Sequence, residues 1–461
     1  MIPTTKEAYD LLHEGVLALS HVERQGIHVD IDYIKNKKQE ITEEIATVEK
    51  KIYESDFYKK WARSVKKGTK INIYSNSQLG KYLYKTKGLK VHKETATGQG
   101  STDEETLRKL MIPELDLLLR IKKLKKIRDT YLKSFEREAG DGLLHPFFSL
   151  HTVRSYRSSS DKPNFQNIPA RDQESFNIVR SAIFPSEGNQ LLEVDYSQLE
   201  VRIAASYCKD EKLTHDILKG DMHRDMAIEI FKIDKFDRTI EGHSTLRNAA
   251  KNGFVFPQFY GDYYANCADH LACTWGGLPK STWKSGMGIP INGSFLSDHL
   301  ISKGLKTYKS FVKHIQNIEA DFWQERYFAY NKWRETTWKR YQRKGYVSSK
   351  TGFIYKGLMK RNDVINYPIQ GSAFHCLLWS LIQIMKTQRR EHWNTKIVGQ
   401  IHDSIVFDAH PKEIDKVLKI VRCIMCNDVR QKWTWITVPL EIEAELSPVN
   451  GSWADKKPYP F

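Results

Sequence analysis

A short apolar run that ends in an acidic residue constrains the fold of this chain more than any other feature of its sequence. Residues 191–194 (LLEV) read as a strand, which runs into Asp195 and then into a helix-like segment that begins near Ser197. A carboxylate at the end of a buried strand is costly unless it is paired or bound to a metal. Taken alone, Asp195 is explained as well by a structural cap as by a catalytic role.

A second acidic residue occupies the apex of a predicted hairpin. Residues 397–400 and 405–408 read as strands joined by a tight turn, and this turn contains Asp403. Aspartate is common in turns, so this position is also ordinary by itself. Two aspartates on adjacent strands, however, suit two Mg²⁺ ions about 3.5–4 Å apart, which activate an attacking hydroxyl and neutralise a leaving pyrophosphate. Magnesium prefers one or two carboxylates plus substrate phosphates, so the pair predicts a two-metal site.

The chain carries a large excess of basic residues. Its 461 residues include 72 Lys plus Arg against 56 Asp plus Glu, a formal net charge of +16. Such an excess favours a polyanionic partner, because each phosphate that a protein neutralises releases condensed counterions. Membrane surfaces also attract basic proteins, but the longest apolar stretch, residues 374–385, is shorter than the roughly 20 residues that a span needs. Six cysteines are few for this length, and the N-terminus lacks the features of a signal peptide, which favours a reducing interior.

Two charged, periodic segments read as amphipathic helices. They are residues 35–66 and 102–139, both rich in Lys, Glu, Leu and Ile, and the polar stretch between them, residues 72–101, reads as a loop-rich tip. The run 121–128 (IKKLKKIR) holds five cations, and a solvated helix face explains it as well as a phosphate-binding surface does. Residues 207–344 read as mostly helical, and a further helix is expected from about Gln370.

A pair of cations stands in the middle of the predicted helical section. Arg247 and Lys251 are four residues apart and therefore fall on one face of a helix, where they could hold a triphosphate. Phe254, Phe256 and the pair Tyr260-Gly261 follow. A surface cation pair would be the simpler interpretation if this segment stood alone.

Together, these segments resemble the conserved motifs of family A DNA polymerases, the relatives of bacterial DNA polymerase I. The first motif is DYSQLEVR from Asp195, the second is Arg247-x-x-x-Lys251 followed by Phe and Tyr-Gly, and the third is His402-Asp403 after a strand. The resemblance continues at residues 19–30, 71–83, 157–171, 221–227, 365–373 and 438–453. It covers the chain from about residue 14, and so many motifs in the right order are not coincidental.

The resemblance implies an α+β fold with a right-hand polymerase architecture: a palm built on an antiparallel sheet, mostly helical fingers and a helical thumb. The expected segments are an N-terminal palm segment at 1–31, the thumb at 32–140 and the palm with the first Asp motif at 141–206. The fingers follow at 207–344, and the palm with the second Asp motif and the C-terminus occupies 345–461.

The resemblance also implies roles for individual residues. Asp195 and Asp403 would hold the metal ions, and Lys251 would be a further catalytic residue. The residues implied to bind the incoming dNTP are Arg247, Lys251, His223, Gln198, Glu200, Phe256 and Tyr260. The residues implied to contact the primer–template are Arg157, Asn366, Gln370 and His402.

Glu200 has two interpretations. Ser197 and Glu200 form the pattern of a capping box at the start of a helix, and the pattern alone favours that structural role. The resemblance favours a position under the sugar, where Glu200 would exclude a 2′-hydroxyl. The two roles are compatible.

The second motif contains one residue more than the family pattern. The extra residue lies between Lys251 and Tyr260, close to Pro257, and a π-bulge could absorb it. Counting back from Tyr260 places Phe256 beside the sugar, whereas counting forward from Lys251 places Val255 there. The register of this helix therefore stays open.

Three further positions depart from the family. Ser404 stands where the family usually has Glu, and we expect activity to be retained because both principal metal ligands remain. Asn362 replaces a basic residue, and its role is unassigned. Residues 262–310 are longer and more aromatic than the matching segment of the family.

The implied function is the extension of a primer 3′-hydroxyl with dNTPs on a DNA template, with two Mg²⁺ ions as cofactors and Mn²⁺ as their expected substitute. The resemblance begins almost at Met1 and leaves no room for a proofreading 3′–5′ exonuclease domain, so we expect no excision of mismatches by this chain. The expected partners are primer–template DNA and dNTPs, with a separate exonuclease or a processivity factor as further candidates and no membrane. The expected location is the bacterial cytoplasm or an infected host cell, and a small phage-like or plasmid-like replicon would fit.

Two competing functions deserve a test. A single-subunit RNA polymerase shares the two-aspartate palm, but Glu200, and Phe rather than Tyr near the sugar, argue for deoxynucleotides. A catalytically silent DNA-binding protein is suggested by Ser404, and the presence of both aspartates together with Arg247 and Lys251 argues against it.

Overall fold

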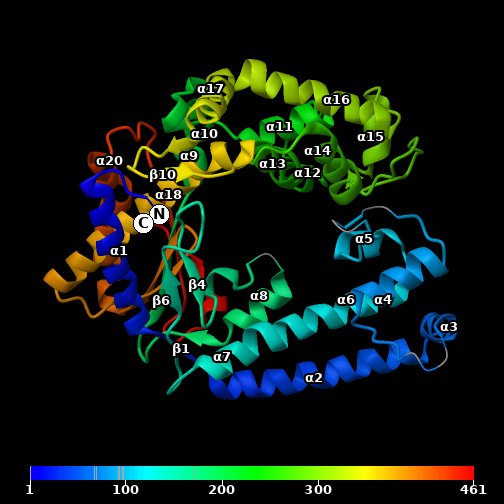
Figure 1. The fold of residues 1–461 in the computed structure, drawn as a ribbon, viewed down its shortest axis with the longest axis horizontal. Coiled ribbons are helices and arrows are strands. Elements are labelled where there is room, and N and C mark those ends of the chain that lie inside the picture. The colour runs from blue at the N-terminus through cyan, green and yellow to red at the C-terminus, as the bar shows by residue number, and fades with distance from the viewer. Residues whose placement is uncertain (1, 67, 69, 92–93, 96–97, 171) are drawn as a thin grey trace.

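A five-stranded antiparallel sheet forms the base from which the rest of the chain extends in the computed structural model (Figure 1), which describes residues 2–461 except 67, 69, 92–93, 96–97 and 171. The strands lie in the order β11 (Lys396–Ile401), β12 (Ser404–Ala409), β6 (Gln190–Tyr196), β13 (Ile442–Leu446) and β14 (Lys457–Pro458). All four neighbouring pairs are antiparallel. The sheet confirms the expected hairpin and the expected α+β class.

Three helices pack around this sheet. They are α1 (Lys6–Gln25), α9 (Leu199–Cys208) and the 30-residue α18 (Arg361–Arg390), and α18 contacts both of the others. The sequence predicts that α18 starts near Gln370, but the helix begins at Arg361 and contains Pro368. Pro and Gly in this stretch usually interrupt helices. Here the burial of nearly every residue from Ile369 to Met385 outweighs their local preference.

A lower arm, residues 31–138, projects from the base (Figure 1). Its long helix α2 is amphipathic as expected, because Ile34, Ile41, Ile45, Val48 and Ile52 form one buried stripe that packs on α6. The predicted loop-rich tip is more ordered than expected, since it contains α4 and η1. The elements of this arm are α2 (Ile31–Glu54), α3 (Asp56–Ser64), α4 (Asn76–Gly80), η1 (Lys81–Thr86), α5 (Glu104–Lys109), α6 (Pro113–Lys125), η2 (Lys126–Leu132) and α7 (Lys133–Glu138).

The basic run at 121–128 lies on α6 and η2 of the lower arm. Its apolar residues Ile121, Leu124 and Ile127 are buried. Lys123 lies 2.6 Å from Asp172, and Arg128 lies 2.8 Å from Asp129. Carboxylates therefore pair with two of the five cations of this run.

An upper arm, residues 211–344, projects in the same direction as the lower arm (Figure 1). The segment at 262–310, for which the sequence offered no explanation, forms α14, η5, a small hairpin and α15, and α14 packs on α16. At the tips of the arms, Thr274 donates a hydrogen bond to Glu105 over 3.3 Å. The elements are α10 (Glu211–Leu218), α11 (Met222–Phe231), α12 (His243–Ala250), η4 (Lys251–Val255), α13 (Phe256–Phe259), α14 (Tyr264–Asp269), η5 (His270–Trp275), β7 (Pro290–Ile291), β8 (Ser294–Phe295), α15 (Leu296–Ser302), α16 (Tyr308–Asp321), η6 (Phe322–Arg326) and α17 (Phe328–Lys344).

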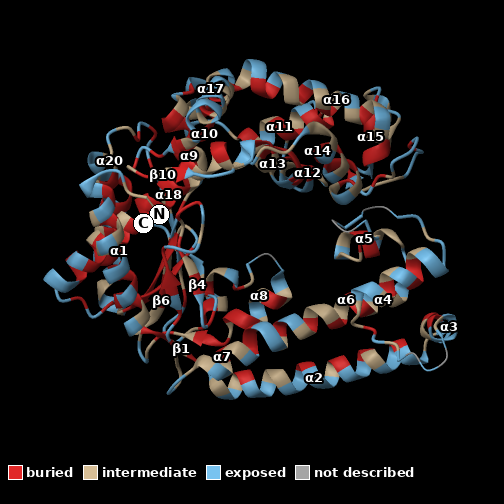
Figure 2. Cartoon of the chain, in the orientation of Figure 1, coloured by how far each residue is buried: buried red, intermediate tan, exposed pale blue. Residues whose placement is uncertain are grey.

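Two hydrophobic cores support these parts. One core joins the upper arm to the helices around the sheet, and the other joins the lower arm to the sheet's opposite side and to Trp453. Figure 2 shows the buried residues gathered at the base and along the inner stripes of the arm helices. The remaining elements are β1 (Ile27–Val29), β2 (Leu143–Leu144), β3 (Phe147–Ser149), β4 (Ser159–Asp161), η3 (Phe165–Asn167), α8 (Gln173–Arg180), β5 (Ile183–Phe184), β9 (Tyr346–Ser348), β10 (Ile354–Lys356), η7 (Pro411–Glu413), α19 (Ile414–Arg422), η8 (Cys423–Asp428), α20 (Val429–Lys432) and η9 (Trp453–Asp455).

Candidate active site

The two predicted metal ligands lie on neighbouring strands of the sheet. Asp195 stands near the end of β6 and is the register partner of Ser404, and Asp403 immediately precedes Ser404 in the turn between β11 and β12. The carbonyl of Asp403 accepts a hydrogen bond from the backbone N–H of Tyr196 over 3.3 Å. The expected juxtaposition of the two carboxylates is therefore present.

The electrostatics of this pair disfavour two ionised carboxylates. Solvent reaches Asp195, but the surrounding protein displaces enough water that burial, followed by the negative charge of Asp403, raises its pKa to about 7. Burial also raises the pKa of Asp403, although the positive charge of Arg157 opposes the shift. A divalent cation between the carboxylates would relieve this repulsion.

The donor atoms fit Mg²⁺ in particular. Both side chains offer carboxylate oxygens, which magnesium prefers, and magnesium commonly takes its other ligands from water and substrate phosphates. Within the described part of the chain, no group of three or more His, Cys, Asp or Glu residues is arranged to hold a metal ion.

A cavity of about 390 Å³ opens beside Asp403, between the base and the upper arm. Its walls come from β6, α9, α13, α17, α18 and the turn that bears Asp403. The cavity brings together segments that are up to about half the chain apart in sequence. Nine of the thirteen predicted site residues line it: Arg157, Gln198, Glu200, Phe256, Tyr260, Asn366, Gln370, His402 and Asp403.

The predicted cations of the upper arm lie next to this cavity, behind Phe256. The ammonium group of Lys251 lies 5.3 Å from the centre of the Phe256 ring, and the His223 ring lies 5.6 Å from it. Burial, followed by the charges of Lys251 and Arg247, lowers the pKa of His223 to about 4, so this imidazole is neutral at pH 7. The structure adds one feature that the sequence did not indicate: Arg247 donates hydrogen bonds of 2.9–3.2 Å to the carboxylate of Asp221.

The helix that carries the second motif contains the predicted π-bulge. Residues Lys251–Val255 form the π-helical turn η4, which accommodates the additional residue. Phe254 is fully buried and packs edge-on against Phe322, with ring centres 5.4 Å apart. Phe256 lines the cavity and Val255 is buried, so the geometry favours the count back from Tyr260.

Glu200 does not cap the helix that follows the first motif. Helix α9 begins at Leu199, and Gln198 occupies the N-cap position with φ 54° and makes no capping hydrogen bond. The Glu200 carboxylate instead contacts the guanidinium of Arg157 and accepts a hydrogen bond from the hydroxyl of Tyr260 over 2.9 Å. The capping-box interpretation is therefore wrong, because the turn before α9 carries Glu200 toward the cavity.

Two asparagines of α18 tie the base to the upper arm. Asn366 donates to the carbonyl of Tyr260 over 3.3 Å, and Asn362 donates to the carbonyl of Gly261 over 3.1 Å. Asn362, which sequence analysis left unassigned, thus holds the loop at the end of α13. Its neighbour Arg361 instead pairs with Glu335.

Two residues without a predicted role, Gln400 and Glu193, hold the Asp403 turn. Gln400 donates to the carbonyl of His402 over 2.8 Å and accepts from the hydroxyl of Ser158 over 2.7 Å. Glu193 accepts from the hydroxyl of Ser404 over 2.8 Å. Glu193 could have been noticed as a charge inside the otherwise apolar run 191–194, but its contact with Ser404 depends on strand register.

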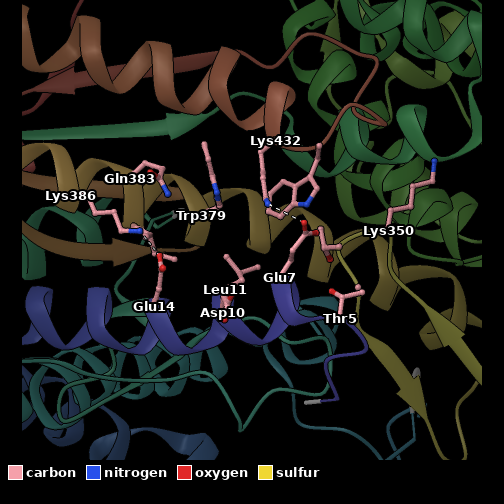
Figure 3. Close-up of a pocket in the computed structure, with 14 residues that line it drawn as sticks. Thr5, Glu7, Asp10, Leu11, Glu14, Lys350, Trp379, Gln383, Lys386 and Lys432 are labelled. Atoms are coloured by element: carbon pink, nitrogen blue, oxygen red, sulfur yellow. Dashed lines mark hydrogen bonds and ion pairs between the residues drawn. The ribbon is translucent and has the colours of Figure 1, made fainter.

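A separate cavity of about 340 Å³ lies between α1, α18 and α20 (Figure 3). Its charged side chains neutralise one another: Lys386 lies 2.6 Å from Glu14, and Lys432 lies 3.9 Å from Glu7. It contains none of the predicted site residues. Because its charges are balanced, it offers no field that would attract a polyanion.

Comparisons with known proteins agree with the geometry. The family model for DNA polymerase family A matches residues 31–455. DNA polymerase I of Bacillus subtilis (strain 168) is 30% identical over 455 residues, and that of Geobacillus stearothermophilus is 27% identical over 458 residues. Each alignment covers 96% of this chain and 45% of the relative, so the chain spans about 45% of the length of these relatives.

The fold is similar to that of a solved structure titled as the POL domain of Pol1 from M. smegmatis in complex with DNA primer-template and dNTP. The TM-score is 0.72 at 22% sequence identity, and the match covers 96% of this chain and 70% of the other. This likeness confirms the expected right-hand architecture. No helix in the described part of the chain combines the length and the apolar character needed to cross a membrane.

Proposed function

The chain belongs to DNA polymerase family A, and on this premise we propose that it extends the 3′-hydroxyl of a primer with dNTPs on a DNA template. The observation that carries the proposal is the position of Asp195 on β6 next to Asp403 in the turn before β12, with Asp403 in the wall of a cavity that Glu200 and Tyr260 also line. A cavity between the base and the upper arm is the place where a primer end and a nucleotide could meet.

We propose that Asp195 and Asp403 hold two Mg²⁺ ions, which would lower the pKa of the primer hydroxyl and neutralise the leaving pyrophosphate. The chain itself would orient the reactants. Lys251 and Arg247 would bind the triphosphate with their charges, and His223, being neutral, would donate or accept a hydrogen bond there. Gln198 would take part in the same binding from the start of α9.

The remaining residues of the cavity would recognise the sugar and the DNA. Glu200, held by Arg157 and Tyr260, would occupy the space that a ribose 2′-hydroxyl needs. Phe256 would lie beside the 3′ position of the sugar, since it lines the cavity whereas Phe254 is fully buried. The residues proposed to contact the primer–template are Arg157, Asn366, Gln370 and His402.

The arms fit the expected division of a right hand. We propose residues 32–140 as the thumb, 207–344 as the fingers, and 1–31, 141–206 and 345–461 as the palm. The formal charge of +16 supports the binding of DNA. These 461 residues are further proposed to extend primers without excising mismatched ends, because the polymerase match accounts for residues 31–455 of them.

The test is extension of a labelled primer on a DNA template with and without Mg²⁺. Asp195→Ala and Asp403→Ala should each abolish extension and leave DNA binding nearly unchanged. Asp10→Ala is a matched control, because this carboxylate pairs with Lys6 on α1 and lines the separate cavity, away from the predicted site. Substantial extension by either aspartate variant would refute the proposal that Asp195 and Asp403 hold the Mg²⁺ ions. Mg²⁺-dependent shortening of a mismatched primer that survives Asp195→Ala would reveal a nuclease site.

A further inference from the structure

A buried carboxylate lies directly beneath the predicted metal site. Glu193 belongs to β6, two residues before Asp195, and its side chain is only 14% exposed. Its Oε1 accepts from the hydroxyl of Ser404 over 2.8 Å. Its Oε2 accepts from the indole N–H of Trp453 over 3.0 Å and contacts the ammonium group of Lys456, which is 2% exposed. Both oxygens of this anion therefore contact protein groups, and the guanidinium of Arg180 lies 3.9 Å from Oε2.

Such an arrangement is expensive to maintain. A charge taken out of water is tolerated only when it is paired and hydrogen-bonded, and a pair of apolar side chains would often serve stability equally well. Lys456 and Trp453 come from the C-terminal segment, more than 250 residues from Glu193 along the chain. The hydrogen bond from Ser404 distinguishes Glu193 and its two partners, Lys456 and Trp453, from an ordinary structural ion pair.

Ser404 connects Glu193 to the turn that bears Asp403. Its hydroxyl lies 2.8 Å from Glu193 and 3.0 Å from the carbonyl of Ile401, which begins the turn. Its backbone follows Asp403 directly and pairs with Asp195 across the strands. A displacement of the Glu193 carboxylate would therefore move the Asp403 turn relative to β6.

We propose that Glu193, held by Lys456 and Trp453, is a positioning residue that sets the separation of Asp195 and Asp403 through Ser404. The inference rests on the proposed function, because it concerns the two residues proposed to bind Mg²⁺. Magnesium requires near-ideal octahedral geometry, so its binding is sensitive to small displacements of its ligands. Lys456 pairs with Glu193, and the remaining negative charge of Glu193 adds to the effects of burial and of Asp403 in raising the pKa of Asp195.

The test is Ser404→Ala, which removes the link and leaves both aspartates and Glu193 in place. Outer groups that orient metal ligands typically change metal affinity by 10- to 100-fold. We expect the half-saturating Mg²⁺ concentration for primer extension to rise roughly tenfold, near the lower end of that range, because the link acts through the backbone. At saturating Mg²⁺, extension should largely recover.

A second readout avoids turnover. Mn²⁺ binding is measured by electron paramagnetic resonance with a dideoxy-terminated primer–template and a dNTP, and its dissociation constant should rise by a similar factor. Ser447→Ala is the matched control, because Ser447 and Ser404 are both 2% exposed. The hydroxyl of Ser447 accepts from the N–H of Leu191 on β6 over 2.8 Å. Its loss should affect thermal stability and leave metal affinity unchanged.

Equal Mn²⁺ affinity in the wild type and Ser404→Ala would overturn the proposal, and so would an equal loss of affinity in both serine variants. If Ser404→Ala fails to fold, Ser404→Cys applies the same test, because a thiol is a much weaker hydrogen-bond donor than the hydroxyl that Glu193 accepts from. A wild-type protein that binds Mn²⁺ more tightly than Ser404→Ala but extends no primer would refute the proposed function and leave this inference standing.

Discussion

Replacing Phe256 by Tyr should make the enzyme accept dideoxynucleotides, whereas the same change at Phe254 should only destabilise the protein. The two residues are separated by one position, but η4 turns them in different directions. Phe256 is half-buried and lines the cavity, and Phe254 is fully buried against Phe322. A hydroxyl added at the first position would point into the cavity proposed to bind the nucleotide, and one added at the second would meet apolar side chains.

The magnitudes follow from these environments. A hydrogen bond between the new phenol at 256 and a charged phosphate would replace the bond that the absent 3′-hydroxyl made, and such bonds contribute about 1.5–3 kcal/mol. At 1.36 kcal/mol per factor of ten, dideoxynucleotide incorporation should rise roughly 10- to 150-fold relative to dNTP incorporation. At 254, an unsatisfied buried hydroxyl costs about 1–3 kcal/mol, and the added volume costs a similar amount.

The assay is termination of primer extension over a range of ddNTP to dNTP ratios, combined with thermal unfolding of each variant. Phe256→Tyr should shift the termination pattern and leave the unfolding midpoint near that of the wild type. Phe254→Tyr should lower the midpoint and leave termination unchanged. The reverse pattern would refute the reasoning, because it would place Phe254 beside the sugar and the extra residue after it.

Three other outcomes are expected. Glu200→Ala should increase the incorporation of rNTPs relative to dNTPs, and an unchanged ratio would reject the steric role. The free energy of unfolding should change by no more than about 1 kcal/mol, because Glu200 caps no helix and Arg157 can regain water. The logarithm of the DNA-binding constant should fall linearly with the logarithm of salt concentration, and a flat response in a filter-binding titration would exclude phosphate neutralisation. Burial lowers the pKa of His375 to about 3, so below pH 6.5 protons bind preferentially to the unfolded chain. The free energy of unfolding should therefore fall by about 2 kcal/mol between pH 6.5 and 5. His375→Gln should remove this part of the loss in urea unfolding at the two pH values, and an identical loss in the variant would show that other groups cause it.

Local sequence patterns predict the strands and the helix that carry the site. The run 191–194 predicts β6, and the stretch around Asp403 predicts the hairpin of β11 and β12, because apolar residues between turn residues specify strands locally. The i, i+4 spacing of Arg247 and Lys251 and the extra residue before Tyr260 together indicate a helix with a π-bulge. These features depend on residues that are close in sequence.

The way in which these elements meet depends on the tertiary structure. The contact between Glu193 and Ser404 joins residues 211 positions apart, and it exists because β6 and β12 pair in one register. The direction of Glu200 depends on the left-handed turn at Gln198, which prevents the cap that the local pattern predicts. A local pattern specifies which conformations a segment can adopt, whereas the burial of polar groups specifies which partner from a distant segment must satisfy them.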